Sequence, residues 1–501
     1  MAEYLTPGVF VEDINQVVDM PSGTVPASAF VGVAKSGPVG VPVAVTSWNK
    51  YLNTFAGGQE SAFLTNSYLA YAVYGFFQNG GKLCYVLRVS SGTVSSDNTI
   101  TYAAKPATST GDNAFATGDN AFAKAFSAKY EGDWGNKLKI KCPKSGVNET
   151  LGIFTLQVLL NDVIVESWAN LGSGVNVKGC FADVINAESQ FIEVTDITVP
   201  ADLSTMKNVD VNIAFSGGTD GDSTVSDAIY KVSLHALDFY DTIRLVAIPG
   251  ASNDLQVALA EYCTEMEYRI AICEGEETAT TTNLITLRER LNNFNASLYG
   301  PWIQVTNPLS SSGAPISIPA CGHISGVYAR ISDSRGFWKA PAGTEAILKG
   351  AINVTKVFTQ DDTDVLNPKG INALLSKPNY GVVIWGARSC RSDLSYASDL
   401  YTNITIKKTC YDLTQKYVFE PHDSSLWTKV KTTVQDYLNG VYQQGGFFGD
   451  NADQAYFVKC DEELNPLSIR NQGKLICEVG YATKKPAEFI IFRISHELTT
   501  A

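Results

Sequence analysis

The fold is decided by residues 242–273, which read TIRLVAIPGASNDLQVALAEYCTEMEYRIAIC. This stretch opens with an apolar run at 242–248 and closes with another at 268–273, and both runs have the length and composition of buried strands. The segment between them carries apolar residues three or four positions apart, which predicts an amphipathic helix at 253–266. The apolar face of this helix holds Leu255, Leu259, Tyr262 and Met266. Strand, helix and strand in this order predict an α/β layer.

The same alternation continues on both sides of this unit. The further elements that we expect are a strand at 29–38, a helix at 61–78, a strand at 83–89, a helix at 282–292, a strand at 296–305, and helices at 319–332, 404–417 and 426–442. The first three of them form a second β-α-β unit with its own small core. The sequence therefore predicts a chain that is mainly α/β.

A different pattern occupies the middle of the chain. Residues 150–215 alternate between apolar and polar positions, as in a β-rich domain. The string GDNAFA occurs at 111–116 and again at 118–123, and its acidic spacing fits a surface loop or hairpin pair better than a calcium loop. The segment SGGTDGDSTVSD at 216–227 predicts a turn or linker before the α/β part resumes.

Composition bounds the class of protein. The chain has 501 residues, 45% of them hydrophobic and 18% charged, which predicts a folded protein of several domains. Its net charge of -13 repels phosphate, so we expect no direct binding of nucleic acid. The longest strongly apolar run, 68–77, is about half of the ~20 residues that a spanning helix needs. The start MAEYLTPGVF lacks the pattern of a secretory signal, and we therefore expect a protein that stays in a cytoplasm.

Motifs for chemistry are missing from the sequence. No pair of its ten cysteines has C-x-x-C spacing, and its four histidines do not form metal-ligand spacings, so we expect no metal and no cofactor. The nearest string to an esterase elbow, Gly322-His323-Ile324-Ser325-Gly326, has the wrong order. The α/β part also lacks a glycine-rich loop for phosphate. We expect a protein that is not an enzyme.

Three segments resemble the tail sheath proteins of contractile phages and related injection machines. They are YLTPGVFVEDI at 4–14, DSRGFWKAPAG at 333–343, and GKLICEVGYATKKPAEFIIFRISHE at 473–497. The residues that carry the middle motif are Asp333, Arg335, Gly336, Trp338, Lys339 and Pro341. One departure is Lys407-Lys408, where the family pattern leads us to expect two arginines.

The resemblance implies a fold and a function. The expected fold is mixed α/β and α+β, with an inner α/β sheath domain built from both terminal parts, at 21–95 and 355–485, and with two insertions, a β-rich one at 96–235 and an α/β one at 236–354. The implied function is a structural subunit that forms a helical sheath, with hexameric rings, around a tail tube and contracts to drive the tube through a host envelope. The implied partners are other copies of the chain, the tube protein, and the baseplate and tail terminator proteins. The implied location is the virion tail, assembled in the cytoplasm of a bacterial host, and the alternative is the sheath of a tailocin or an extracellular contractile injection system.

Both ends of the chain have the pattern of lone strands. A strand without a local partner needs another sheet for its backbone groups, so we expect an N-terminal arm at 1–20 and a C-terminal arm at 486–501 that pair with neighbouring subunits. The alternative is that each strand joins a sheet of its own chain. The apolar residues of the two arms are Val9, Phe10, Val11, Ile14, Phe489, Ile491, Phe492 and Ile494.

Two further hypotheses concern side chains near the C-terminus. The helix expected at 426–442 places Lys429 and Lys431 away from its apolar stripe, where they either contact an acidic tube or are simply solvated. Ten cysteines are either buried reduced thiols or include intersubunit disulfides in the released particle. The candidates for such disulfides are Cys390, Cys410, Cys460 and Cys477.

Overall fold

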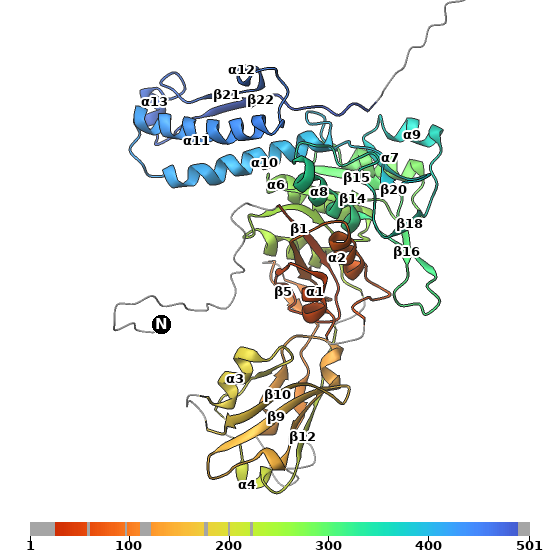
Figure 1. The fold of residues 1–501 in the computed structure, drawn as a ribbon, viewed down its shortest axis with the longest axis vertical. Helices are drawn as coiled ribbons and strands as arrows, with labels where there is room; N and C mark the ends of the chain where they lie inside the picture. Colours follow the sequence, from red (N-terminus) through yellow and green to blue (C-terminus); the bar gives the residue numbers. More distant parts are fainter. Residues whose placement is uncertain are drawn as a thin grey trace, which may run out of the picture.

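The structure, a computed structural model, describes residues 26–57, 61–95, 98–110, 122–174, 179–198, 201–220 and 224–488. Figure 1 shows three bodies along the long axis of the molecule: a β-rich body at one end, a central α/β body, and a C-terminal body made of two long helices and a hairpin. The mixed α/β fold class that the sequence predicts is confirmed.

The central body is built on an eight-stranded sheet with the order β2-β3-β1-β13-β14-β15-β19-β20. Its strands are β1 (Ala27–Gly32), β2 (Val43–Val45), β3 (Cys84–Arg88), β13 (Ile243–Ala247), β14 (Ile270–Glu274), β15 (Ala296–Gly300), β19 (Ile371–Lys377) and β20 (Gly381–Ile384). The six inner strands run parallel, and β2 and β20 close the two edges in antiparallel pairing. Parallel strands need crossover connections, and helices supply them here.

Helices cover both faces of this sheet. One face packs on α1 (Trp48–Phe55), α2 (Leu69–Gln78), α8 (Cys321–Arg335) and the start of α10 (Ala397–Thr414). The other face packs on α5 (Asp227–Leu234), α6 (Asn253–Glu265), α7 (Thr281–Arg290) and α9 (Gln360–Leu366). Strand β14 shows why its run is continuously apolar: Ile270 and Ile272 enter the first core, and Ala271 and Cys273 enter the second.

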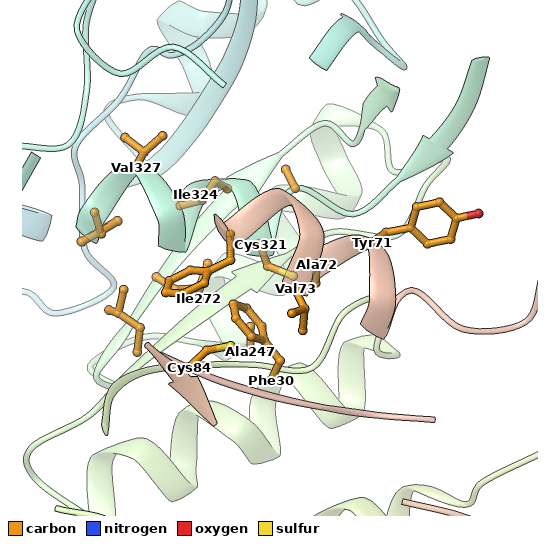
Figure 2. Close-up of a cluster of buried hydrophobic side chains, with 14 of the residues drawn as sticks. Phe30, Tyr71, Ala72, Val73, Cys84, Ala247, Ile272, Cys321, Ile324 and Val327 are labelled. Atoms are coloured by element: carbon orange, nitrogen blue, oxygen red, sulfur yellow. The ribbon is translucent and has the colours of Figure 1, made fainter. Parts of the chain in front are cut away.

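Helices α2 and α8 pack closely against each other. Figure 2 shows Ala72 and Val73 of α2 beside Cys321 and Ile324 of α8, above Phe30 of the sheet. The contact is close because glycines of α8 face the backbone of α2: a Cβ at Gly322 would lie 2.2 Å from the carbonyl oxygen of Ala72. The string that resembles a misordered esterase elbow is therefore a helix-packing surface.

The central sheet crosses the domain boundary that we predicted at residue 236. Strands β13, β14 and β15 come from the segment expected to form a separate insertion at 236–354, but they lie between β1 and β19 in one sheet. A strand-helix pattern reveals each unit but not the neighbour of each strand, because pairing in a parallel sheet joins segments far apart in the chain. Other predicted elements differ in their bounds, and the helix expected at 404–417 begins at Ala397. The helix expected at 61–78 begins at Leu69, and the strand expected at 296–305 divides into β15 and β16 (Ile303–Thr306), which belong to different sheets.

The remaining strands of the central body form two small sheets. Strands β16, β17 (Pro315–Ile318) and β18 (Ala351–Val354) make a three-stranded sheet, and β4 (Gly92–Val94) pairs with β5 (Ile100–Tyr102).

The β-rich body holds a seven-stranded antiparallel sheet with the order β10-β9-β8-β12-β6-β7-β11. Its strands are β6 (Thr108–Thr110), β7 (Phe126–Ala128), β8 (Leu138–Cys142), β9 (Ile153–Leu160), β10 (Val163–Gly172), β11 (Ile192–Val194) and β12 (Val211–Ser216). Helices α3 (Phe181–Glu188) and α4 (Leu203–Met206) add residues to its core. The first copy of the GDNAFA repeat lies outside the described residues, and the second lies mostly outside them.

One buried arginine joins the β-rich body to the central body. Arg88, the last residue of β3, donates hydrogen bonds to the carbonyl oxygens of Gly37 at 2.7 Å and Glu131 at 2.8 Å. Asp220 lies 3.8 Å from the same guanidinium group. Glu131 lies between β7 and β8, and Asp220 lies between β12 and α5, so this one side chain contacts two separate segments at the base of the β-rich body.

The C-terminal body consists of α10, α11 (Ser424–Gln443), α12 (Ala452–Ala455), α13 (Leu467–Arg470) and the strands β21 (Tyr456–Lys459) and β22 (Glu478–Tyr481). The buried stripe of α11 includes Trp427, Val430, Val434, Leu438 and Val441, in agreement with the predicted apolar face. Asp423 caps this helix by accepting from the Leu426 N–H at 2.9 Å.

A buried carboxyl group gives the central body a pH dependence. Glu274 ends β14, where its carboxyl oxygens accept from the N–H groups of Gly250 at 3.2 Å and Cys321 at 3.1 Å. Burial raises the pKa of Glu274 from its ordinary 4.5 to about 7, and the two N–H donors offset this only in part. Between these two pKa values the folded state keeps a proton that the unfolded state has released, so stability falls as pH rises through this window.

We predict that Glu274→Gln becomes more stable relative to the natural protein as pH rises from 5 to 8. The amide stays neutral, whereas the buried carboxyl ionises at a cost of up to about 3 kcal/mol. Urea unfolding of both proteins at pH 5 and pH 8 measures the change. Equal differences at the two pH values would contradict it.

Candidate assembly surfaces

The hairpin of the C-terminal body is an incomplete sheet. Strands β21 and β22 pair over four residues each, and the described part of the chain adds no third strand to them. Tyr456 and Val458 point inward to the α11 side, while Phe457 lies on the outer face and is 52% exposed. An isolated two-stranded sheet is marginal in water and leaves unpaired backbone groups at its edges. This hairpin is therefore suited to accept further strands.

Lysines fasten α10 to the central body. Lys407 forms an ion pair with Glu267. Lys408 is buried, pairs with Asp412 of the same helix, and lies 3.4 Å from Asp241, which comes just before β13. The rings of Tyr268 and Tyr411 face its ammonium group. The two lysines that replace the expected arginines thus act within the chain, as contacts between two bodies.

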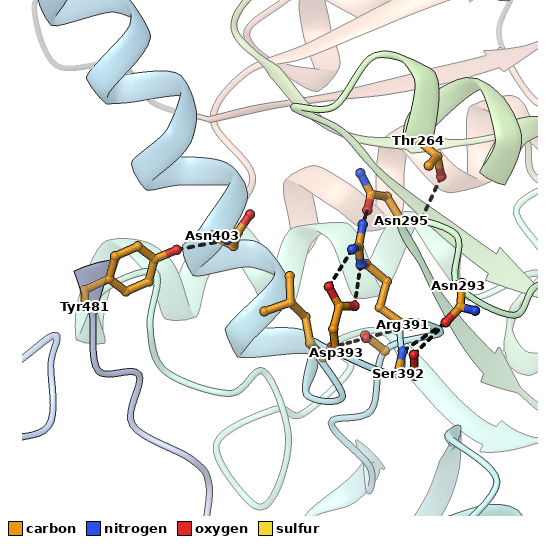
Figure 3. Close-up of polar contacts among 10 residues, drawn as sticks. Thr264, Asn293, Asn295, Arg391, Ser392, Asp393, Asn403 and Tyr481 are labelled. Carbon is orange, nitrogen blue, oxygen red and sulfur yellow. Dashed lines mark hydrogen bonds and ion pairs between the residues drawn. The ribbon is translucent and has the colours of Figure 1, made fainter. Parts of the chain in front are cut away.

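Polar contacts attach α10 and the segment before it to neighbouring elements, as Figure 3 shows. Asn403 of α10 donates to the Tyr481 hydroxyl of β22 at 3.0 Å, which attaches the hairpin to the helix. Before α10, Arg391 forms an ion pair with Asp393 at 2.5 Å and donates to Asn295 at 3.2 Å. The base of α10 is therefore fixed to the loop that leads into β15.

The family motif makes the connection between α8 and the C-terminal body. Gly336 ends α8 with a φ of 91°, and a Cβ there would lie 2.3 Å from the Trp338 ring, so only glycine fits. Trp338 packs against the core that contains Val441 of α11. Asp333 pairs with Lys82 at 2.8 Å, and Arg335 pairs with Glu345 at 2.5 Å.

The last two motif residues complete this turn. The Lys339 N–H donates to the Gly336 carbonyl at 3.1 Å, and Pro341 is buried just beyond it. The motif is thus explained by packing within one chain, with its charged residues at the surface.

The chain leaves the hairpin over the central body. Arg388, which stacks over the Tyr396 ring, forms an ion pair with Glu488, the last residue that the structure describes. Both side chains are largely buried, at 22% and 14% exposure. The sequence offers no signal for this contact. It holds residue 488 against the central body.

The apolar residues of the two arms lie outside the described residues. These are Val9, Phe10, Val11, Ile14, Phe489, Ile491, Phe492 and Ile494. The strand pairing expected of the arms stays a prediction.

The lysine and cysteine candidates lie in different surroundings. Lys429 and Lys431 are exposed on α11, as the pattern predicts. Cys390 is fully buried, so it presents no thiol to another subunit in this structure. Cys410 and Cys477 are half-buried, and Cys460 is 6% exposed. Of the four candidate cysteines, Cys460 and Cys477 lie opposite each other at the end of the β21–β22 hairpin.

Within the described residues, no group of three or more histidine, cysteine or acidic side chains is arranged to hold a metal ion. None of the described helices is both long and apolar enough to cross a membrane. His323, which lies beside Cys321 in the sequence, is buried in α8, and this burial lowers its pKa to about 4.

The fold of this chain is similar to that of sheath proteins from contractile machines. The helical sheath of the anti-feeding prophage in its contracted state is 20% identical, with a TM-score of 0.54 over 99% of this chain and 100% of the other. The contracted PVC sheath, from an extracellular contractile injection system, is 18% identical, with a TM-score of 0.56 over 99% of both chains. A sheath tail protein from Listeria innocua is 13% identical, with a TM-score of 0.59 over 87% of this chain and 89% of the other.

Sequence comparison agrees with the fold. Residues 223–390 match the family described as the phage tail sheath protein central domain. A tail sheath protein of Salmonella phage ViI is 23% identical over 171 residues, which are 32% of this chain. The match spans a quarter of the length of that relative. The resemblance inferred from the three sequence segments is confirmed.

Proposed function

We propose that this protein is the structural subunit of a contractile phage tail sheath. It polymerises helically, in hexameric rings, around a tail tube and contracts to drive the tube through the host envelope. The sheath family match and the sheath folds support this proposal. The observation that carries it is the incomplete β21–β22 sheet, in a chain whose two ends both have the pattern of strands.

The assembly follows from backbone chemistry. Arms from neighbouring subunits add strands to the β21–β22 sheet, so that main-chain hydrogen bonds join the subunits into a continuous mesh. Such links hold while the bodies between them rotate, because a hydrogen-bonded ladder depends on the local strands and not on the rest of the interface. The Arg388–Glu488 ion pair sets where one arm departs.

The proposed partners and place are those of a sheath. The subunit contacts other copies of itself, the tube protein, the baseplate and the tail terminator, and it makes no direct contact with nucleic acid. It is assembled in the cytoplasm of a bacterial host, becomes part of the virion tail, and has no enzymatic role. Electron microscopy of the purified protein tests the proposal: ordered hollow sleeves support it, and a protein that stays monomeric with purified tube protein present contradicts it.

The second candidate is the sheath of a tailocin or an extracellular contractile injection system. The structural likeness to the anti-feeding prophage and PVC sheaths, over nearly the whole chain, favours it. Capsid and terminase genes beside this one indicate a phage, and their absence from a locus that encodes a tube protein indicates the injection machine.

We predict that Lys429→Glu lowers tube-templated assembly. If the exposed side of α11 contacts an acidic tube, charge reversal replaces attraction by repulsion. Lys431→Glu is measured beside it. Lys431 also interacts electrostatically with the thiols of the hairpin, so Lys429→Glu is the variant that reports on the exposed side of α11 alone. Sleeve length is measured by microscopy at low and high salt, since salt screens exposed charges. Equal assembly by Lys429→Glu and the natural protein would mean that this face is solvated.

A further inference from the structure

Two cysteines face each other across the C-terminal hairpin. Lys459 of β21 pairs with Glu478 of β22, so the next pair in register is Cys460 and Cys477. Along β21, the inward positions are those of Tyr456 and Val458, and Cys460 continues this alternation. Both thiols therefore lie on the same, inner face of the hairpin.

The ladder shows which type of pair this is. The Ala482 N–H donates to the Ala455 carbonyl at 2.9 Å, which makes Ala455 and Ala482 a hydrogen-bonded pair. Hydrogen-bonded and non-hydrogen-bonded pairs alternate in an antiparallel ladder, so Cys460 and Cys477 form a non-hydrogen-bonded pair. Such pairs have Cα atoms about 4.5 Å apart. This is within the roughly 4.4–6.8 Å that a disulfide spans.

The side chain of Asn465 joins the two segments of the chain just beyond the Cys460–Cys477 pair. The Asn465 amide accepts from the Ile476 N–H at 2.7 Å and donates to the Ile476 carbonyl at 2.9 Å. It also donates to the Asp461 carbonyl at 3.0 Å. Asn465 thus fixes the residues that follow Cys460 and precede Cys477, and the two thiols lie near enough for each to shift the pKa of the other.

We propose that Cys460 and Cys477 form a reversible intrachain disulfide when the protein meets an oxidising medium. A small disulfide, of the glutathione class, is the oxidant. The Cys477 thiolate, the more accessible of the two, attacks one sulfur of the small disulfide, forms a mixed disulfide and releases one small thiol. The Cys460 thiolate then attacks the Cys477 sulfur and releases the second. Two protein thiols are oxidised, one small disulfide is reduced, and the protons pass to the two small thiols.

The bond covalently closes a sheet that has two strands of its own. Reduction leaves these strands held by their ladder and by Asn465. The disulfide contributes the most stability where the hairpin is otherwise only marginally stable. It also removes both thiols from pairing between subunits.

The surroundings make the oxidation slow at neutral pH. Burial raises the pKa of Cys477 to about 12 and also raises the pKa of Cys460. The reactive thiolate fraction therefore rises about tenfold for each pH unit, and we expect about a hundredfold faster oxidation at pH 9 than at pH 7.

The test uses the reduced, full-length protein incubated with oxidised glutathione. Digestion without reductant, followed by mass spectrometry, is expected to yield a peptide pair that joins Cys460 to Cys477, with two fewer of the ten thiols free and the chain still monomeric on a non-reducing gel. Cys410→Ser is the matched control, because Cys410 is a third thiol near Cys477, and this variant is expected to form the same link. Cys477→Ser is expected to lose it. Fully free thiols, a link to Cys410, or multimers joined through these residues would overturn the proposal.

Discussion

Deletion of residues 1–15, or of residues 487–501, is expected to leave a folded monomer that no longer forms sleeves. Every strand of the three larger sheets lies between residues 27 and 384, so neither deletion removes a part of their cores. In the proposed sheath the arms supply the main-chain pairing between subunits. Its loss is repeated at every subunit, and we therefore expect assembly to fall below detection. Circular dichroism checks the fold, and sedimentation with microscopy checks the assembly.

A matched control separates the effect of losing the C-terminal arm from the effect of losing its ion pair with Arg388. The C-terminal deletion also removes Glu488, the partner of Arg388. Glu488→Gln keeps the full arm and loses only the ion pair, so it should reduce assembly far less than the deletion does. Normal sleeves from either truncated protein would show that the terminal strands belong to their own chain. A truncated protein that fails to fold would show that the arm supports the monomer.

The sequence predicted the individual strands and helices of this fold much better than it predicted which strands lie next to each other in a sheet. The stretch at 242–273 folds as β13, α6 and β14, because a buried strand and an amphipathic helix each have a distinct period. The order of the central sheet was not accessible in this way, since β1 lies between β3 and β13, which are separated by more than 150 residues in the chain. No local pattern encodes that choice.

The same distinction holds for the candidate assembly surfaces: features set by local spacing were predictable, and contacts between distant residues were not. The stripe of α11 and the exposure of Lys429 follow from helical spacing. The contact between Cys460 and Cys477 depends on the register of a hairpin whose connecting segment runs from 461 to 476, and sequence spacing does not set that register. Lys407-Lys408 was recognised as a departure from the family pattern, but the contact of Lys408 with Asp241 could not be predicted, because the two residues lie far apart in the chain.

Gly322→Ala is expected to destabilise the central body by about 3 kcal/mol or more. A Cβ at this position would lie 2.2 Å from the carbonyl oxygen of Ala72, 2.4 Å from its Cα and 2.5 Å from its carbonyl carbon. All three atoms are backbone, so no rotamer change relieves the overlap, and α2 must move away from α8. One turn later, a Cβ at Gly326 would lie 2.5 Å from the Phe76 carbonyl oxygen, which means that the helices cannot pivot about a single point.

Gly440→Ala supplies the matched control for this prediction. Gly440 is also inside a helix, α11, but a Cβ there meets nothing within 4 Å. Alanine should therefore stabilise that helix by up to about 1 kcal/mol, through its higher helix propensity. Urea unfolding of both variants separates the two effects. Close approach of α2 and α8 predicts opposite signs for them, and two small changes of the same sign would show that α8 can shift without cost. The central sheet depends on this contact because α2 and α8 together cover the face that contains Phe30 and Ile272.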